Sequence, residues 1–196
     1  MKYFFFIFSF LSVHCSIAQQ QYSINDLKGG KFDDDTNYIY SLPFENNKKV
    51  FLIQAYDSKM SHKGEYALDF KVKKQTKICA ARDGIVIAAR DDSDKGGLKP
   101  ENISDGNHIS IQHADGSVAH YWHLLKNGVF VAIGDTIKKG QMIGLSGNTG
   151  YSAFPHLHFE VVGNDGTGNY RQLATRFNTN KGIVYLRPAH FYRTRH

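Results

Sequence analysis

Cysteine is scarce in this chain of 196 residues, which contains two, at Cys15 and Cys79. Small secreted domains held together by disulfides are dense in cysteine, so this composition excludes that class. Cys79 lies in the apolar run KICAARDGIVIAA, where a buried strand thiol is more common than a reactive one. We therefore expect a domain stabilised by a hydrophobic core, with no internal disulfide.

The sequence also lacks an apolar run of the roughly 20 residues that a transmembrane helix needs. Its longest apolar stretch, YFFFIFSFLSV, covers residues 3–13 directly after Lys2. The small residues Ser16 and Ala18 follow it, at the spacing that a signal peptidase reads. This pattern predicts a signal peptide over residues 1–18, cleaved after Ala18, and export to the periplasm, the medium or the cell surface.

The expected organisation has three parts. After the signal peptide, residues 19–36 are rich in Gln, Asp and Gly and predict a flexible lead-in. Residues 37–196 form one domain, long enough for a sizeable core. Cys15 does not predict a lipid anchor, because His14 precedes it where a small residue is needed.

The net charge of +6 does not come from a basic tract. Lys and Arg alternate with acidic residues, and no nucleic-acid-binding motif is present. We therefore expect no nucleic acid as partner. For an exported protein, an anionic cell-wall polymer is the more natural one, and we expect a monomer.

Helical periodicity is missing throughout, and short β-rich segments alternate with turn residues. Asp83-Gly84 predicts a two-residue turn between KICAA and GIVIAAR, and residues 114–116 predict a hairpin between HISIQH and SVAHYWHLL. GIVYL and HFY are expected to pair at the end of the chain. Residues 91–107 predict a long surface loop. The fold class is all-β: a compact antiparallel β-sandwich or barrel-sandwich hybrid with an open active-site groove.

FPHLHFEVV, residues 154–162, places two imidazoles in an apolar strand. Residues two apart on a strand point to the same face. His156, His158 and Glu160 therefore share one face, and Leu157 and its alternate neighbours face the core. Two imidazoles on one face suggest a metal, although surface histidine pairs are common.

Other residues complete a candidate metal site. A catalytic zinc needs three protein ligands and an open position, and His62, Asp69 and His158 would supply such a set. His123 and His156 would then remain as bases that do not bind the metal. His120, three residues from His123, is expected on the opposite face of the strand.

Taken with their spacing, these motifs resemble the lysostaphin-like zinc endopeptidases that cut peptidoglycan cross-links. SHKGEYALDF, an aromatic before HL, and GLSGNTG followed by PHLHFEV carry the resemblance, which covers roughly residues 49–192. It implies one Zn²⁺ on His62, Asp69 and His158, with His123 and His156 as catalytic residues. In many members four positions separate the first His from the Asp, whereas here there are seven.

The resemblance implies hydrolysis of a peptide bond with a zinc-bound water as nucleophile and His156 as general base. His123 would hold that water or stabilise the oxyanion. Some relatives also use a tyrosine upstream of the first His; Tyr56 fits that place, and Tyr66 is a second candidate. The alternative function is a module without turnover that binds the cell wall or activates a hydrolase. The bond that is cut, glycyl-glycine or D-alanyl, stays open.

Overall fold

Strands form almost all of the regular structure. The computed structural model describes residues 38–58, 60–164 and 170–196, and within these ranges its only helix is the short 3-10 helix η1. The prediction of an all-β chain is confirmed. The elements are β1 (Ile39–Ser41), β2 (Lys49–Gln54), β3 (Ala67–Lys71), β4 (Lys77–Cys79), β5 (Gly84–Arg90), β6 (Gly96–Gly97), η1 (Pro100–Asp105), β7 (His108–Gln112), β8 (Val118–Trp122), β9 (Leu124–Val129), β10 (Thr136–Ile137), β11 (Met142–Ser146), β12 (Gly150–Tyr151), β13 (His156–Asn164), β14 (Tyr170–Gln172), β15 (Arg176–Thr179), β16 (Gly182–Val184) and β17 (His190–Arg193).

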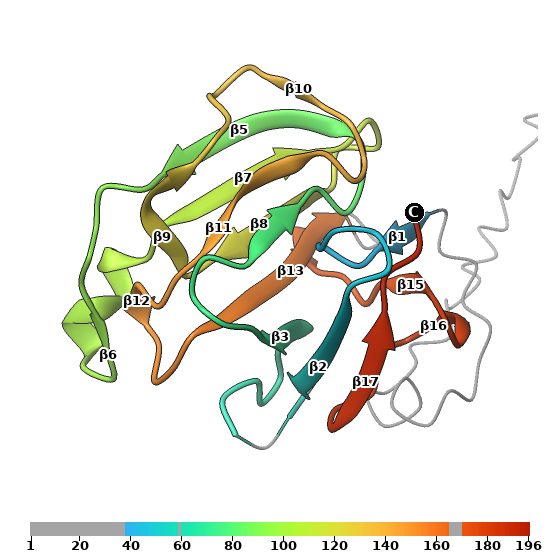
Figure 1. The fold of residues 1–196 in the computed structure, drawn as a ribbon, viewed down its shortest axis with the longest axis horizontal. Coiled ribbons are helices and arrows are strands. Elements are labelled where there is room, and N and C mark those ends of the chain that lie inside the picture. The colour runs from blue at the N-terminus through green and yellow to red at the C-terminus, as the bar shows by residue number, and fades with distance from the viewer. Residues whose placement is uncertain (1–37, 59, 165–169) are drawn as a thin grey trace, which may run out of the picture.

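One large antiparallel sheet organises the molecule (Figure 1). Its strand order is β10-β5-β7-β8-β13-β3-β2-β17, and β14 pairs with the end of β13. A three-stranded sheet, β4-β11-β9, lies against it, and β1-β15-β16 forms another beside the C-terminal strand. The long strand β13 is central, with β8 on one side and β3 on the other.

The core lies on one face of the large sheet because the buried residues alternate along its strands. Leu157, Phe159 and Val161 of β13 are all buried, as are Leu68 and Phe70 of β3. Phe159 packs edge-to-face on Tyr121 of the neighbouring strand β8 and on Phe177 of β15, with ring centroids 5.2 and 6.0 Å away, and the second contact joins two sheets. The opposite face of β13 and β3 is left for His156, His158 and Asp69.

The β7–β8 hairpin forms as predicted. Its turn places Gly116 at φ 82°, and the His113 N–H donates to the Ser117 carbonyl over 2.8 Å. Gly116 suits this position because a left-handed backbone costs glycine little.

Two predicted strand pairings are wrong. Asp83-Gly84 does not close a hairpin, since β4 pairs with β11 while β5 pairs with β7 and β10. The Asp83 carboxylate instead accepts a hydrogen bond from the Lys139 backbone N–H over 2.7 Å, which ties the crossing between sheets to the β10–β11 turn. At the C-terminus β16 pairs with β15 and β17 pairs with β2. Local turn residues cannot specify such long-range partners.

Several other predictions concern single segments. Cys79 is buried, 2% exposed, and unpaired, as expected. The predicted loop 91–107 contains two short elements, β6 and η1.

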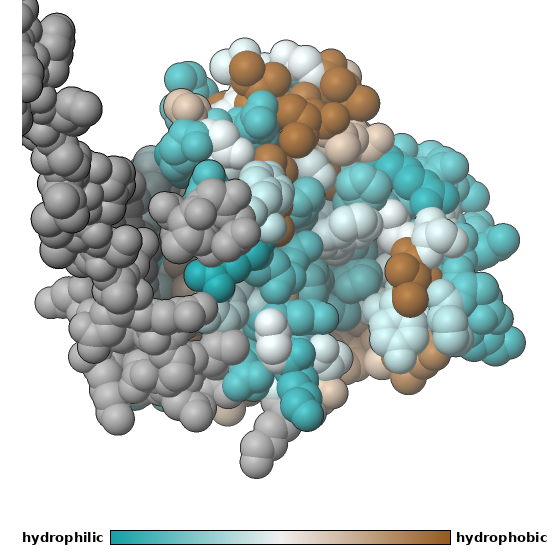
Figure 2. All heavy atoms as spheres, turned by 180° about the vertical axis from the view of Figure 1, so that it is seen from behind, coloured by the Kyte–Doolittle hydropathy of each residue, from teal (hydrophilic) through white to brown (hydrophobic). Residues whose placement is uncertain are grey.

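Apolar side chains gather at the edge formed by β5 and β10 (Figure 2), where Ile85, Ile87 and Ile133 are exposed.

The predicted signal peptide, residues 1–18, and the whole predicted lead-in, residues 19–36, lie outside the described residues. Over the ranges that are described, no helix combines the length and apolarity that a membrane crossing needs.

Candidate metal centre

Strand β13 brings two histidines to the face of the sheet that the core does not use. His158 lies opposite Asp69 of β3 on one side and Trp122 of β8 on the other, and His156 lies opposite Lys71. The alternation predicted for residues 154–162 is therefore present: His158 is half-buried on the open face, while Leu157 and Phe159 are 0% exposed.

Three predicted ligands meet on this face. His62 comes from the loop between β2 and β3, Asp69 from β3 and His158 from β13, and one donor atom of each lies within 4.8 Å of the others. His62 Nε2 is 3.2 Å from Asp69 Oδ2, and His158 Nδ1 is 2.9 Å from Asp69 Oδ1. The seven-residue spacing between His62 and Asp69 does not prevent their approach.

The donor set fits zinc. Bonds of 2.0–2.1 Å in a tetrahedral site place ligand atoms about 3.3 Å apart, close to the two distances just given. The Ala67 carbonyl lies 3.0 Å from His62 Nδ1. A carbonyl only accepts, so Nδ1 carries the proton and Nε2 keeps its lone pair. Metal-binding histidines are commonly held in this way, with the other ring N–H donating to a carbonyl or carboxylate.

His123 and His156 stand beside this cluster, with ring centroids 4.5 Å apart. Each is anchored through Nδ1: His123 donates to the Thr149 carbonyl over 2.7 Å and His156 to the Phe154 carbonyl over 2.8 Å. Both therefore present an unprotonated Nε2. His156 Nε2 lies 3.6 Å from Asp69 Oδ1, farther than the nearest atoms of His62 and His158.

The local environment sets the charge of each group. Burial lowers the pKa of His123 to about 3 and lowers that of His156 too, although Asp69 partly opposes the shift in His156. Burial lowers the pKa of His62, but Asp69 outweighs burial and the net shift is upward. Burial raises the pKa of Asp69, yet His158 and His62 hold it well below its usual range. At neutral pH the site thus has an ionised carboxylate, and the imidazoles of His123 and His156 beside it are neutral.

Gln54 supports the site and was not expected from the sequence. Its Nε2 donates to Asp69 Oδ2 over 2.7 Å, which orients the carboxylate. By simple alternation Gln54 would follow Val50 and Leu52 toward the core. A register shift between Leu52 and Gln54 turns it to the metal face, and no residue type in β2 signals this bulge.

An unusual backbone conformation positions His123. The strand β8 ends at Trp122, and His123 follows at φ 64°, rare for a residue with a side chain. Its neighbours are fixed by the buried Asn107, whose N–H donates to Thr149 Oγ1 over 3.0 Å. Thr149 Oγ1 in turn donates to the Leu124 carbonyl over 2.8 Å. The end of the 91–107 loop therefore holds the segment that anchors His123.

The prediction for His120 is wrong. The alternation argument assumed that His123 continues β8, but the strand has already ended. His120 pairs across the sheet with Glu160 and so shares the face of His158. Ser110 Oγ lies 2.8 Å from His120 Nδ1, and Gln172 donates to Glu160. The polar face thus extends beyond the metal ligands to β7 and β14.

Tyr56 is not brought into the cluster. It is 2% exposed, and its hydroxyl accepts the Thr175 N–H and lies 3.0 Å from the Thr175 carbonyl. Burial raises its pKa to about 12. Tyr66 is half-buried, with its ring 5.5 Å from that of Tyr56. The Tyr56 hydroxyl is therefore engaged inside the core and is not presented to a substrate.

Two imidazoles and a carboxylate around one point, with two further neutral imidazoles beside them, define a metal-dependent hydrolase type of site on an all-β scaffold. Residues 62–170, more than half of the chain, match Peptidase family M23. The chain belongs to this family, which confirms the lysostaphin-like resemblance of the motifs.

Named relatives share the domain but are much longer. Glycyl-glycine endopeptidase ALE-1 of Staphylococcus capitis is 33% identical over 127 residues, 65% of this chain and 32% of that protein. Peptidoglycan DD-endopeptidase ShyA of Vibrio cholerae serotype O1 is 35% identical over 94 residues, 48% of this chain and 19% of that protein. The chain thus spans between a fifth and a third of these relatives.

A solved structure shares the fold. The M23 metalloprotease pseudoalterin, from the deep sea, has a TM-score of 0.54 over 82% of this chain and 98% of that chain, at 17% identity. This likeness supports the all-β architecture.

Proposed function

We propose that this chain is a zinc-dependent endopeptidase that hydrolyses peptide cross-links of bacterial peptidoglycan. The observation that carries the proposal is the convergence of His62, Asp69 and His158, with the Nε2 atoms of His123 and His156 beside them. Family membership supports the reaction class. Two relatives named as endopeptidases, one of them for peptidoglycan, support the substrate.

His62 Nε2, an Asp69 oxygen and His158 Nδ1 would hold one Zn²⁺, which supplies Lewis acidity to the scissile carbonyl and to water. His156 then acts as the general base, because its neutral Nε2 is exposed to the cluster while its Nδ1–H is fixed on a carbonyl. The Phe154 carbonyl stabilises the imidazolium that forms.

His123 has the second role. Its Nδ1–H is held by Thr149, so in the neutral form its Nε2 accepts a hydrogen bond. This geometry favours holding the attacking water over donating to the oxyanion. His156 takes a proton from the attacking water. Because the rings of His156 and His123 are close, they also provide a route by which this proton reaches the leaving amine.

The cell-wall substrate agrees with export by the predicted signal peptide over residues 1–18, to the periplasm or beyond. Accumulation of a mature protein that begins at Gln19, read by N-terminal sequencing, tests this proposal. Size-exclusion chromatography of the same material tests the proposed monomeric state.

Incubation of the purified protein with peptidoglycan, with and without a chelator, tests the function. An endopeptidase releases cross-link fragments, and the chelator stops the release. Mass analysis of the fragments assigns the bond, which the relatives leave open between glycyl-glycine and DD links. Binding to peptidoglycan with no release at any zinc concentration identifies a non-catalytic module and refutes the proposal.

A further inference from the structure

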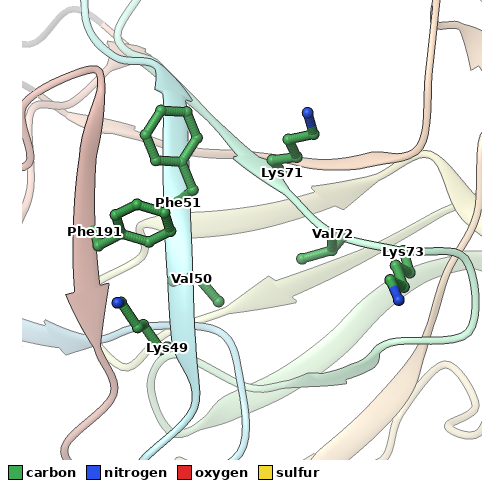
Figure 3. A pocket seen from close by; sticks show the side chains of 7 residues that line it. All are labelled: Lys49, Val50, Phe51, Lys71, Val72, Lys73 and Phe191. Atoms are coloured by element: carbon green, nitrogen blue, oxygen red, sulfur yellow. The ribbon is translucent and has the colours of Figure 1, made fainter.

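A basic aromatic groove lies on the outer side of β2, β3 and β17. Its volume is about 510 Å³, and Figure 3 shows two phenylalanine rings together on one side and lysines around the hollow. The groove is lined by Lys49, Val50, Phe51, Lys71, Val72, Lys73 and Phe191.

The groove concentrates positive charge that is not neutralised within the described residues. The lysine and arginine side chains that form ion pairs within the described residues all lie outside the groove: Lys77, Arg82, Arg90, Lys126 and Lys138. The ammonium group of Lys49 lies 4.5 Å from the centroid of Phe191, and the rings of Phe51 and Phe191 are 4.9 Å apart. Phe191 is 53% exposed despite its size. An exposed ring next to lysines that form no ion pair with the described part of the chain is typical of a binding surface.

One row of the sheet connects this groove to the catalytic face. His156 pairs with Lys71, Lys71 with Phe51, and Phe51 with Phe191, across β13, β3, β2 and β17. Leu68 and Phe70 face the core, so Lys71 shares the open face with Asp69. With strands about 4.8 Å apart, the residues of the row from Lys71 to Phe191 lie roughly 5 to 15 Å from His156, the proposed general base.

An extended peptide advances about 3.3 Å per residue. A chain that crosses the sheet from His156 therefore reaches the groove two to four residues from the bond that is cut. Ammonium groups around a hollow with apolar walls select a carboxylate on a peptide that also has methylene or methyl groups.

We propose that the groove binds a carboxylate-bearing segment of the substrate peptide, two to four residues to one side of the scissile bond. This inference rests on the proposed function, because it takes the substrate to be a peptide held at the metal site. A polymer of phosphate groups is the other anion of matching charge. The continuous row of paired residues from the groove to His156 favours the peptide. A phosphate polymer that is not cut at the metal site would need no such connection.

Kinetics with soluble cross-linked peptides from peptidoglycan, used with free carboxylates and after amidation, tests the inference. In the double variant Lys49→Gln/Lys71→Gln, we expect KM for the free carboxylate form to rise about tenfold, the effect of two surface ion pairs. We expect kcat to change less than about twofold and KM for the amidated peptides to stay constant. The matched control is Lys181→Gln, whose ammonium also lies over an aromatic ring, that of Tyr192, but outside the groove.

Equal KM changes for both peptide forms, or no change, refute the groove proposal while leaving the endopeptidase intact. Calorimetric titration of the same peptides tests the groove when the protein has no peptidase activity. If the wild-type protein cuts neither form but binds the carboxylate form, and the double lysine variant does not bind it, the proposed function fails and the groove stands. Lysine-dependent binding of poly(glycerol phosphate), with no preference between the peptide forms, also overturns the proposal.

Discussion

His156 and His158 lie two residues apart on one face of β13, yet their ring nitrogens meet different groups. His158 directs Nδ1 at Asp69 from 2.9 Å, whereas the Nδ1 of His156 is bonded to the Phe154 carbonyl. A second anchor for His156 is Ser152 Oγ, 3.1 Å away. Chain spacing alone treats the two imidazoles as equivalent. Their hydrogen bonds separate a ligand from a base.

Substitution of each histidine tests this separation. We expect His158→Ala to lose bound zinc and activity together, because one of three protein ligands is gone. We expect His156→Ala to keep zinc and to lose turnover by about 10² to 10⁴, the usual value of a general base. Metal analysis of both variants, alongside peptidoglycan hydrolysis, provides the readout. Loss of zinc from His156→Ala would make it a ligand and contradict the assignment.

His113 predicts a pH dependence of stability that is independent of the metal site. It is 3% exposed, donates Nδ1–H to the Asp83 carbonyl, and its Nε2 has no partner within the described residues. Burial lowers its pKa to about 4 from 6.5. Between these values the unfolded chain binds a proton and the folded chain does not, so stability falls as pH decreases.

The expected loss from His113 is about 2 to 3 kcal/mol between pH 7 and pH 4. His113→Gln removes the titration, so its free energy of unfolding should decline less over the same interval. Urea denaturation of both proteins at pH 7 and pH 4 measures the difference. Equal declines in the two proteins would show that His113 already accepts a proton in the folded state.

At the scale of elements, the short strand β12 lies against Gly106, close to His123. Gly150 has φ 79°, and a Cβ there would be 2.7 Å from Gly106 Cα and 3.5 Å from His123 Nδ1. Gly150→Ala must therefore shift the backbone next to the Thr149 carbonyl. We expect a destabilisation of about 1–3 kcal/mol and a loss of turnover on the order of a hundredfold from displacement of His123, with zinc retained.

Gly182→Ala is the matched control for Gly150→Ala. Gly182 has φ 87°, but a Cβ there meets nothing within 4 Å. It should lose about 1 kcal/mol of stability from backbone strain alone and keep full turnover. Thermal unfolding and turnover of the two variants form the test. An active Gly150→Ala would mean that the Thr149 anchor does not position His123.

The sequence predicts elements better than their partners. Alternation identified both faces of β13, and the turn at Gly116 identified the β7–β8 hairpin, because each depends on neighbouring residues. The pairing of β4 with β11 joins segments more than sixty residues apart, and no local rule encodes it. The roles of Gln54 and His120 depend on a bulge and on the exact end of a strand. Both are decided by packing and not by residue type.

At the scale of the whole molecule, the candidate metal links segments that are far apart in the chain. His62 belongs to the loop before β3, while His158 lies 89 residues after Asp69, in the central strand β13. Gln54 connects the same carboxylate to β2. Zinc bound at this point would join two adjacent strands of the large sheet, β3 and β13, to the loop before β3. A ligand that binds only the folded state stabilises it.

We therefore expect zinc to raise the melting temperature. At a hundredfold excess over its dissociation constant the gain is about 2.7 kcal/mol, or roughly 5–10 °C for a domain of this size. His158→Ala should show no shift, whereas His123→Ala, which keeps all three ligands, should shift like the wild type. Thermal scans of the metal-free proteins with and without zinc measure this. An equal shift in His158→Ala would mean that zinc binds elsewhere, and the proposed centre would have to be abandoned even if peptidoglycan hydrolysis depended on metal.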